Sequence, residues 1–232
     1  MPSFSPEEWT AILLSLKVAG AATIAVLPVG LVFAWLLARR DFWGKTVLDG
    51  ILHLPLVLPP AVTGYLLLIG FGRRGPIGAF LESCCGISFS FRWTGAALAA
   101  AIMGLPLMIR AIRLTIEQID ARLERAAATL GAGPWRIFFT VTLPLAAPGI
   151  LAGSIIAFAK ALGEFGATIT FVSSIPGETQ TLSLSIYSLL QVPGGDAAAF
   201  RLALVSIVIS LAALAASEIM ARRLSRRIQG LT

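Results

Sequence analysis

Apolar positions along the chain gather into blocks of about 20 or more residues, separated by shorter polar segments. The blocks lie at about 10–38, 47–71, 93–112, 145–166 and 199–220. A helix rises about 1.5 Å per residue, so about 20 apolar residues are enough to cross the hydrocarbon core of a bilayer. The pattern therefore predicts an all-α membrane protein with five transmembrane helices, forming one domain over residues 1–232.

The composition excludes a soluble domain. Of 232 residues, 57% are apolar and 13% charged, and the mean hydropathy is +0.87, whereas soluble domains are about 25% charged. The net charge of +6 would point to nucleic acid in a soluble protein. In a membrane protein, excess Lys and Arg sets the orientation instead, so we expect a lipid bilayer as partner and no nucleic acid.

The distribution of Lys and Arg between the blocks predicts the orientation. If the N-terminus is outside, the inner segments carry 12 basic residues, namely Arg39, Arg40, Lys45, Arg110, Arg113, Arg122, Arg125, Arg136, Arg222, Arg223, Arg226 and Arg227. The outer segments then carry 4, namely Arg73, Arg74, Arg92 and Arg201. Because cytoplasmic loops concentrate basic residues, we predict the N-terminus outside and the C-terminus in the cytoplasm. The polar segment 167–198 is then an outer or re-entrant segment, and whether 180–191 dips into the bilayer stays open.

The second block contains three prolines, Pro55, Pro59 and Pro60. Each removes a backbone donor and disturbs the preceding helical turn. In lipid, such a break is tolerated where neighbouring groups satisfy the freed carbonyls. One interpretation is a kinked helix that lines a pathway or gate, with Pro59 and Pro60 as candidate gate residues; an ordinary packed kink is the other.

Two charges stand in the fourth block, Lys160 and Glu164. Residues four apart lie on one helix face, and unpaired charges at mid-bilayer cost at least about 2.5–3.5 kcal/mol. We predict a structural ion pair, with Glu164 turned into a helix–helix contact; a proton relay is the alternative. The two cysteines, Cys84 and Cys85, have no His or second Cys pair nearby, so we expect free thiols rather than a disulfide or metal site, and no cofactor.

The segment between the third and fourth blocks predicts a short helix. Asp120 can cap it, and Leu123, Ala126, Ala127 and Leu130 form a narrow apolar stripe. Gly131 supplies a left-handed end, and Pro134 can open a second helix. Small side chains let a helix sink into a groove on a partner protein, although a helix lying on the membrane surface would show the same pattern.

This segment resembles the cytoplasmic signature loop of ABC importer permeases. The pattern is Glu-x-Ala-Ala, then Gly after three residues, then a β-branched residue and Leu-Pro, and it stands here as Glu124, Ala126, Ala127, Gly131, Val141, Leu143 and Pro144. The commoner form begins Glu-Ala-Ala six residues before the Gly. Here Arg125 occupies that position, and Glu124 lies one residue earlier.

Three further segments are similar to the permease subunits of molybdate importers. They are LPLVLPPAVTGYLLL at 54–68, AKALGEFGATITFVSSIPGET at 159–179 and IYSLLQVPGG at 186–195. Together with the signature loop they cover about two-thirds of the chain, in the expected order. Sulfate permeases share a looser version of the GEFGATITFVS-IPGET stretch.

The resemblance implies a type I ABC importer permease fold and a transport subunit, not an enzyme, in the bacterial inner membrane. It implies a homodimer, two cytoplasmic ATPase subunits and a periplasmic oxyanion-binding protein as partners, with residues 113–143 as the cytoplasmic coupling loop. The residues that would couple to the ATPase are Glu124, Arg125, Ala126, Ala127, Leu130 and Gly131. The chain has no GxxxxGK[ST] phosphate loop of its own.

An oxyanion crossing the membrane should meet hydrogen-bond donors, and the outer half offers Thr168, Thr170 and Ser173 as candidate pathway residues. Ordinary loop polarity is the alternative explanation of these hydroxyls. The cargo itself stays open among molybdate, tungstate and sulfate. A secondary transporter is less favoured, because such proteins tend to show internal repeats and charges at the midplane, and this sequence shows neither. A membrane enzyme acting on lipid would need a clustered catalytic set, which one His and scattered carboxylates do not provide.

Overall fold

The computed structural model describes the backbone of residues 4–229 and the side chains as far as residue 216. This part of the chain is helical, and no strand occurs within it. The helices are α1 (Pro6–Arg39), α2 (Lys45–Val57), α3 (Pro60–Phe71), α4 (Pro76–Cys85), α5 (Trp93–Gln118), α6 (Ala121–Thr129), α7 (Pro134–Ile137), the π-helix η1 (Phe138–Thr142), α8 (Leu143–Leu162), α9 (Gly166–Val172), α10 (Leu182–Leu189) and α11 (Asp196–Gln229).

Four helical stretches are each long and apolar enough to cross a membrane: α1, α5, the continuous run Pro134–Leu162 and the part Asp196–Ala216 of α11. The second predicted span, 47–71, is not a single helix. It consists of α2 and α3, whose axes are bent by 113° at the break between them. The pair makes a fifth span only if its two parts are counted together.

The break between α2 and α3 has a local cause in the two prolines. Leu58 and Pro59 both precede a proline, and this position disfavours the helical region. Both adopt extended backbone angles, with φ −71° and ψ 145° at Leu58 and φ −53° and ψ 134° at Pro59. Pro60 then opens α3 at the first helical position, where its missing N–H costs nothing. The predicted kink is therefore a sharp turn.

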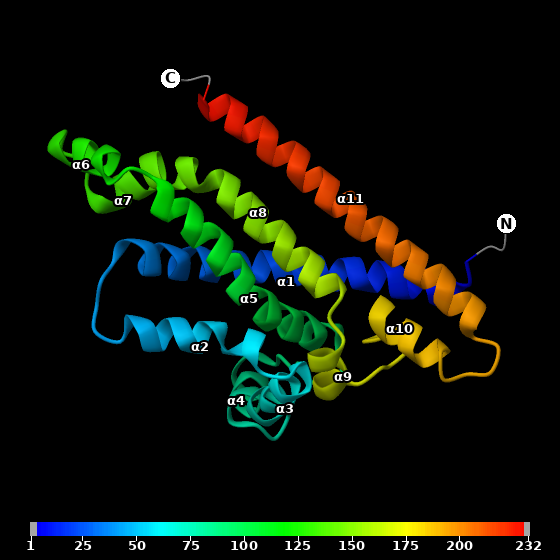
Figure 1. The fold of residues 1–232 in the computed structure, drawn as a ribbon. Helices are drawn as coiled ribbons and strands as arrows, with labels where there is room; N and C mark the ends of the chain where they lie inside the picture. The colour runs from blue at the N-terminus through cyan, green and yellow to red at the C-terminus, as the bar shows by residue number, and fades with distance from the viewer. Residues whose placement is uncertain (1–3, 230–232) are drawn as a thin grey trace.

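The core of the bundle is α5, which packs between α1 and α8. Small residues allow the close contacts that membrane helices need. A Cβ on Gly104 would lie 3.3 Å from the Ala157 side chain, and one on Gly149 would lie 2.1 Å from the Thr115 hydroxyl. Figure 1 shows α8 running beside α5, with α11 on the outer side of α8.

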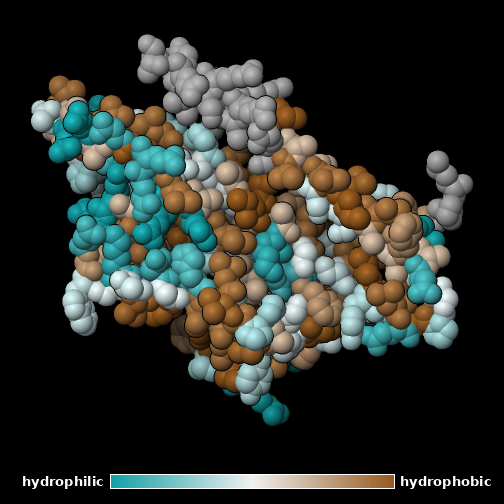
Figure 2. All heavy atoms as spheres, viewed as in Figure 1, coloured by the Kyte–Doolittle hydropathy of each residue, from teal (hydrophilic) through white to brown (hydrophobic). Residues whose placement is uncertain are grey.

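The two ends of the bundle differ in polarity. The turn between α1 and α2, the helices α6 and α7 and the last turns of α11 lie at one end, and the start of α1 lies near α10 at the other (Figure 1). Figure 2 shows hydrophilic residues gathered at the end that holds α6 and α7, and largely hydrophobic residues across much of the face between the ends. The polar end is the one predicted to be cytoplasmic; the side chains of the basic segment 222–227 lie outside the described residues.

Two predicted boundaries change. The apolar block predicted at 93–112 lies in α5, which continues to Gln118 and so forms the first part of the predicted coupling loop; Arg113 and Glu117 form an i,i+4 ion pair at 2.7 Å there. The fourth span was expected to reach 166, but α8 ends at Leu162, and Gly163 leaves the helical conformation with φ −88° and ψ 4°. Glu164 therefore lies in the connection to α9 rather than on α8.

The predicted outer segment 167–198 is partly helical. It contains most of α9 and all of α10, joined by a connection with turns. The short helix α10 packs between α1 and α11. Its first backbone N–H, from Leu182, donates to the Ser15 hydroxyl of α1 at 2.6 Å, so this segment is fixed to the bundle.

Candidate functional site

The short helix predicted at the cytoplasmic end is present as α6, with the caps that the sequence indicates. The Asp120 side chain accepts the Arg122 backbone N–H at 2.8 Å. Gly131 lies in the left-handed region at φ +82°, and Pro134 opens α7. These three predictions are confirmed. They leave α6 as a nine-residue helix held between α5 on one side and the run α7–η1–α8 on the other.

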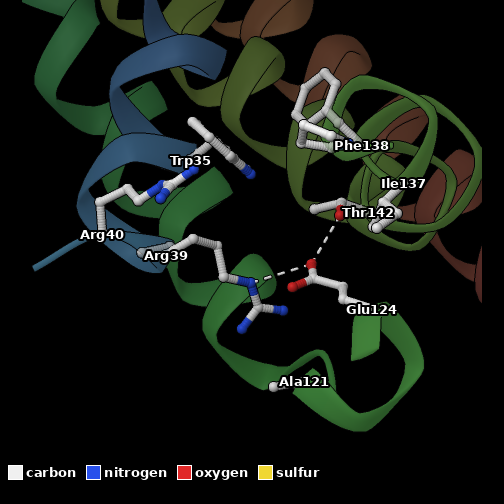
Figure 3. A pocket seen from close by; sticks show the side chains of 10 residues that line it. Trp35, Arg39, Arg40, Ala121, Glu124, Ile137, Phe138 and Thr142 are labelled. Atoms are coloured by element: carbon white, nitrogen blue, oxygen red, sulfur yellow. Dashed lines mark hydrogen bonds and ion pairs between the residues drawn. The ribbon is translucent and has the colours of Figure 1, made fainter. Parts of the chain in front are cut away.

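Glu124 of α6 is bonded within its own chain. Its Oε1 lies 3.2 Å from Arg39 Nε at the end of α1 and accepts the Thr142 hydroxyl of η1 at 2.7 Å. Arg39 Nη2 also donates to the Ile119 carbonyl at 3.0 Å. Figure 3 shows the Arg39 and Thr142 side chains reaching Glu124 from two different helices. One carboxylate thus ties α6 to both α1 and η1.

These contacts lie along a hollow of about 410 Å³ between the end of α1 and the turn from α6 to η1 (Figure 3). Its apolar side is formed by Trp35 and Phe138, whose rings meet edge to face with centroids 5.9 Å apart. The Arg40 guanidinium lies over the Trp35 ring at 5.6 Å. Cations and aromatic rings in such contacts attract each other, so this contact orders the side chains at the end of α1. The contact of Trp35 with Phe138 joins α1 to η1.

The π-helix η1 provides the second side-chain partner of Glu124. Its last residue, Thr142, is buried, with 1% of its surface exposed, and its hydroxyl is the one that reaches Glu124. π-helical turns are rare and occur mostly as short insertions, often at functional sites. Here the insertion lies where the run after α6 joins α8.

The predicted coupling residues fall on two faces of α6. Arg125, Ala126 and Leu130 are exposed, Leu130 at 88%, and Gly131 follows them on the surface. Glu124 and Ala127 are the two half-buried residues of the helix. Glu124 and Ala127 are therefore turned toward their own chain, whereas the other four predicted coupling residues lie on the surface.

A second region lies at the opposite end, where α3 packs against α9. A Cβ on Gly64 would lie 2.5 Å from the Ala167 carbonyl oxygen, and one on Gly166 would lie 2.7 Å from Pro60 Cβ. The two helices therefore touch through backbone at Gly64. Pro59 and Pro60, the predicted gate residues, form the turn that brings α3 to this contact.

The predicted pathway hydroxyls do not share one surface. Thr168 is buried at 2% exposure, so in this chain it belongs to the core. The Thr170 hydroxyl donates to the Gly166 carbonyl at 2.9 Å. Ser173 is exposed and ends α9 with a positive φ of +62° and an extended ψ of −170°.

Lys160 and Glu164 lie in contact. The Lys160 ammonium donates to Glu164 Oε2, and the Ala167 backbone N–H donates to Glu164 Oε1 at 3.0 Å. Glu164 is only 3% exposed, whereas Lys160 is half-buried. The carboxylate thus joins the end of α8 to the first turn of α9.

Several functional candidates were not predicted from the sequence. Arg39 and Thr142 are separated from Glu124 by 85 and 18 residues, so no local pattern links them. The ion pair between Arg113 and Asp49, at 3.1 Å, joins α5 to α2 in the same manner. Cys84 and Cys85 are exposed free thiols, and among the side chains that the structure describes no three His, Cys, Asp or Glu gather as metal ligands would.

The bundle of long apolar helices with one polar end defines an integral membrane protein, and its sequence gives the class. Residues 27–226 match the family described as the binding-protein-dependent transport system inner membrane component. Because the match covers most of the chain, this protein belongs to that family. It is a multi-pass transport subunit of the bacterial inner membrane.

Individual relatives include two molybdenum transport permeases and, at lower identity, a sulfate transport permease. The chain is 59% identical over 215 residues to the molybdenum transport system permease protein ModB of Escherichia coli K12, covering 93% of this chain and 94% of the relative. It is 53% identical to ModB of Haemophilus influenzae over 95% of this chain and 96% of the relative. The sulfate transport system permease protein CysT of E. coli is 36% identical over 87% of this chain and 72% of the relative.

Solved structures share the fold. A bacterial ABC transporter that imports the polysaccharide alginate superposes with a TM-score of 0.75, at 20% identity, over 95% of this chain and 80% of the other. The MetNI methionine ABC transporter in an inward-facing conformation gives a TM-score of 0.68, at 15% identity, over 94% of each chain. The fold is therefore that of the type I ABC importer permeases.

Proposed function

We propose that this protein is the permease subunit of an ABC importer for molybdate, forming the pathway across the membrane and coupling it to ATP hydrolysis by a separate subunit. The observation that carries the proposal is the identity of 59% with a molybdenum transport permease over nearly the whole chain. The exposed helix α6 supports the coupling half, because it is a short rod fixed at both ends to apolar helices of spanning length.

In the proposed cycle, two copies of this chain form the pathway and two ATPase subunits bind beneath them. A periplasmic binding protein delivers the oxyanion to the outer end. Closure of the ATPase pair moves α6, and the contacts of Glu124 carry that movement to α1 and to the run η1–α8. Close-packed protein interiors have low compressibility, so a displacement of one helix is passed on to the helices in contact with it.

The outer gate of this proposal is the contact between α3 and α9. The two helices meet at backbone distance at Gly64, and each is joined to the rest of the bundle through a break, at Pro59 and at Gly163. Elements bounded by such breaks can move as units. The ion pair of Lys160 with Glu164 fixes the angle between α8 and α9 and keeps the carboxylate away from an anionic cargo.

The experiment is transport by the purified complex in proteoliposomes. The chain is reconstituted with its ATPase subunit, and a molybdate-loaded binding protein is added outside. We expect uptake of labelled molybdate that requires ATP and the binding protein together. Uptake without ATP, or driven by an ion gradient instead, would show a different energy source and overturn the proposal.

Sulfate or tungstate is the second candidate cargo, and the identity of 36% with a sulfate permease supports sulfate. The same vesicles distinguish the cargoes when each oxyanion is offered with its own binding protein. For the molybdate proposal, the sulfate-loaded protein stimulates ATP hydrolysis little or not at all. Equal stimulation by sulfate would replace molybdate with a broader oxyanion cargo.

A further inference from the structure

The exposed face of α6 and its flanks carries free positive charge, while the acidic groups of the same segment are engaged. Arg122 and Arg125 are exposed on α6, and Arg136 is exposed on α7. Asp120 accepts a backbone N–H at the start of the helix. Glu124 pairs with Arg39.

The geometry of a helix explains why Glu124 is unavailable to a partner. Successive residues are rotated by about 100° around the axis, so Glu124 and Arg125 point in different directions. The half-buried residues Glu124 and Ala127 mark the inward face, and the exposed residues Arg122, Arg125 and Ala126 lie around the opposite one. Arg125, which directly precedes Ala126 and Ala127 in the sequence, therefore places a cation on the outward face of α6.

We propose that α6 docks into a cleft with an acidic rim, with Arg122 and Arg125 as its contacts, while Glu124 is a positioning residue that locks α6 to α1 and η1. The inference rests on the proposed function, because it assigns the chemistry of the ATPase surface that receives α6. The partner that receives the exposed face of α6 is therefore an acidic groove of the ATPase subunit.

Removing Glu124 from its present contacts would leave charges without partners. The Arg39 side chain is 16% exposed and the Glu124 side chain 20%, and each is the other's counter-charge. Separating a largely buried pair exposes each partner to the full cost of its burial. Glu124 therefore stays with Arg39 when α6 docks, and a pull on α6 reaches α1 through Arg39 and η1 through Thr142.

The first experiment measures binding of the ATPase subunit to the permease in lipid nanodiscs. Arg125→Glu and Arg122→Glu are compared with Arg92→Glu, the same charge change at an exposed residue just before α5, near the opposite end. We expect Kd to rise about 10-fold or more for the two α6 variants and to stay near wild type for Arg92→Glu. Wild-type binding should also weaken as salt is raised. An unchanged Kd in both α6 variants would overturn the inference.

The second experiment separates docking from positioning. Thr142→Val removes the hydroxyl donor to Glu124 at nearly constant volume, and Thr142→Ser keeps it. In vesicles we expect Thr142→Val and Glu124→Gln to bind the ATPase but to import several-fold less molybdate per ATP hydrolysed, while Thr142→Ser stays near wild type. If Glu124→Gln raises Kd as much as Arg125→Glu does, Glu124 is a partner contact and the positioning role is wrong.

Failure of the inference and failure of the proposed function give different results. If wild-type protein binds no ATPase subunit and imports no oxyanion with one, the proposed function fails. If the wild-type complex imports molybdate with ATP, but the α6 variants behave otherwise than stated, only the assignment of Arg122, Arg125 and Glu124 fails.

Discussion

Gly131 and Gly133 lie two residues apart in the turn between α6 and α7, but their backbones differ. Gly131 is left-handed at φ +82°, whereas Gly133 is extended at φ −70° and ψ 162°. A Cβ would meet no atom within 4 Å at either position. The two sites therefore differ in conformational strain and not in available space.

We predict that Gly131→Val disrupts the end of α6, because a side chain in the left-handed region costs roughly 1–2 kcal/mol and a β-branched one more. The variant should therefore lose the stimulation of ATP hydrolysis by the binding protein. The protein should still insert into the membrane. Binding-protein-stimulated ATP hydrolysis by the complex measures the effect, and Gly133→Val is the matched control. Full hydrolysis in Gly131→Val would mean that this turn does not matter for coupling.

Lys160 and Glu164 differ in burial, which predicts an order among their variants. Lys160→Met leaves a carboxylate that is 3% exposed with only the Ala167 N–H as partner, and breaking a buried pair in this way costs about 3–5 kcal/mol. Glu164→Gln leaves an ammonium that is less enclosed by protein, with 29% of the Lys160 side chain exposed, so its loss should be smaller. The double variant should be milder than Lys160→Met. Thermal unfolding of the purified protein gives the order, and additive losses would indicate separate roles.

At the scale of elements, the tightest backbone contact between α3 and α9 is at Gly64. A Cβ on Gly64 would lie 2.5 Å from a carbonyl oxygen and 2.9 Å from the Ala167 Cα, both backbone atoms that cannot step aside. Gly70, in the same helix, has its nearest neighbour at 4.0 Å, the end of the Ile77 side chain.

Gly64→Ala should therefore push α3 away from α9 and destabilise the protein by about 1–3 kcal/mol. Gly70→Ala should be neutral or slightly stabilising, since alanine is the better helix former. Unfolding temperature and molybdate uptake are measured for both. Similar behaviour of the two variants would show that the α3–α9 contact is not as tight as described.

The sequence predicted those features whose causes are local. The cap at Asp120, the left-handed Gly131 and the opening of α7 at Pro134 each depend on a few neighbouring residues, and all three are present. The contacts between distant segments had no such signal. Arg39 reads as an ordinary charge at a membrane boundary, and nothing in its neighbourhood indicates that it reaches Glu124.

The turn at Pro59 lies between these cases. Its position was evident from the prolines, but its size depends on where α3 finds a packing surface. The 113° bend becomes favourable because Gly64 fits against Ala167 of α9. The end of α5 was likewise not set by hydropathy: the helix extends past the apolar block to Gln118, where the i,i+4 pair of Arg113 and Glu117 adds a small stabilisation.

At the scale of the whole molecule, the predicted orientation can be tested with the natural thiols. Cys84 and Cys85 are exposed at the end of α4, in the segment expected outside. A membrane-impermeant maleimide should label intact spheroplasts of cells expressing the protein. In a variant with both cysteines replaced by serine, Leu130→Cys, at 88% exposure on the other end, should react only after lysis. The reverse pattern would invert the topology.

Neither arm of the bent pair is long enough to cross a bilayer alone. With 13 residues in α2 and 12 in α3, each arm spans about 20 Å, against a hydrocarbon core of about 30 Å. The partner that α3 needs, α9, is synthesised much later, after α5 and α8. A nascent chain that stops before Gly166 therefore holds α3 without its largest packing partner, so the final placement of this arm must wait until α9 has been synthesised.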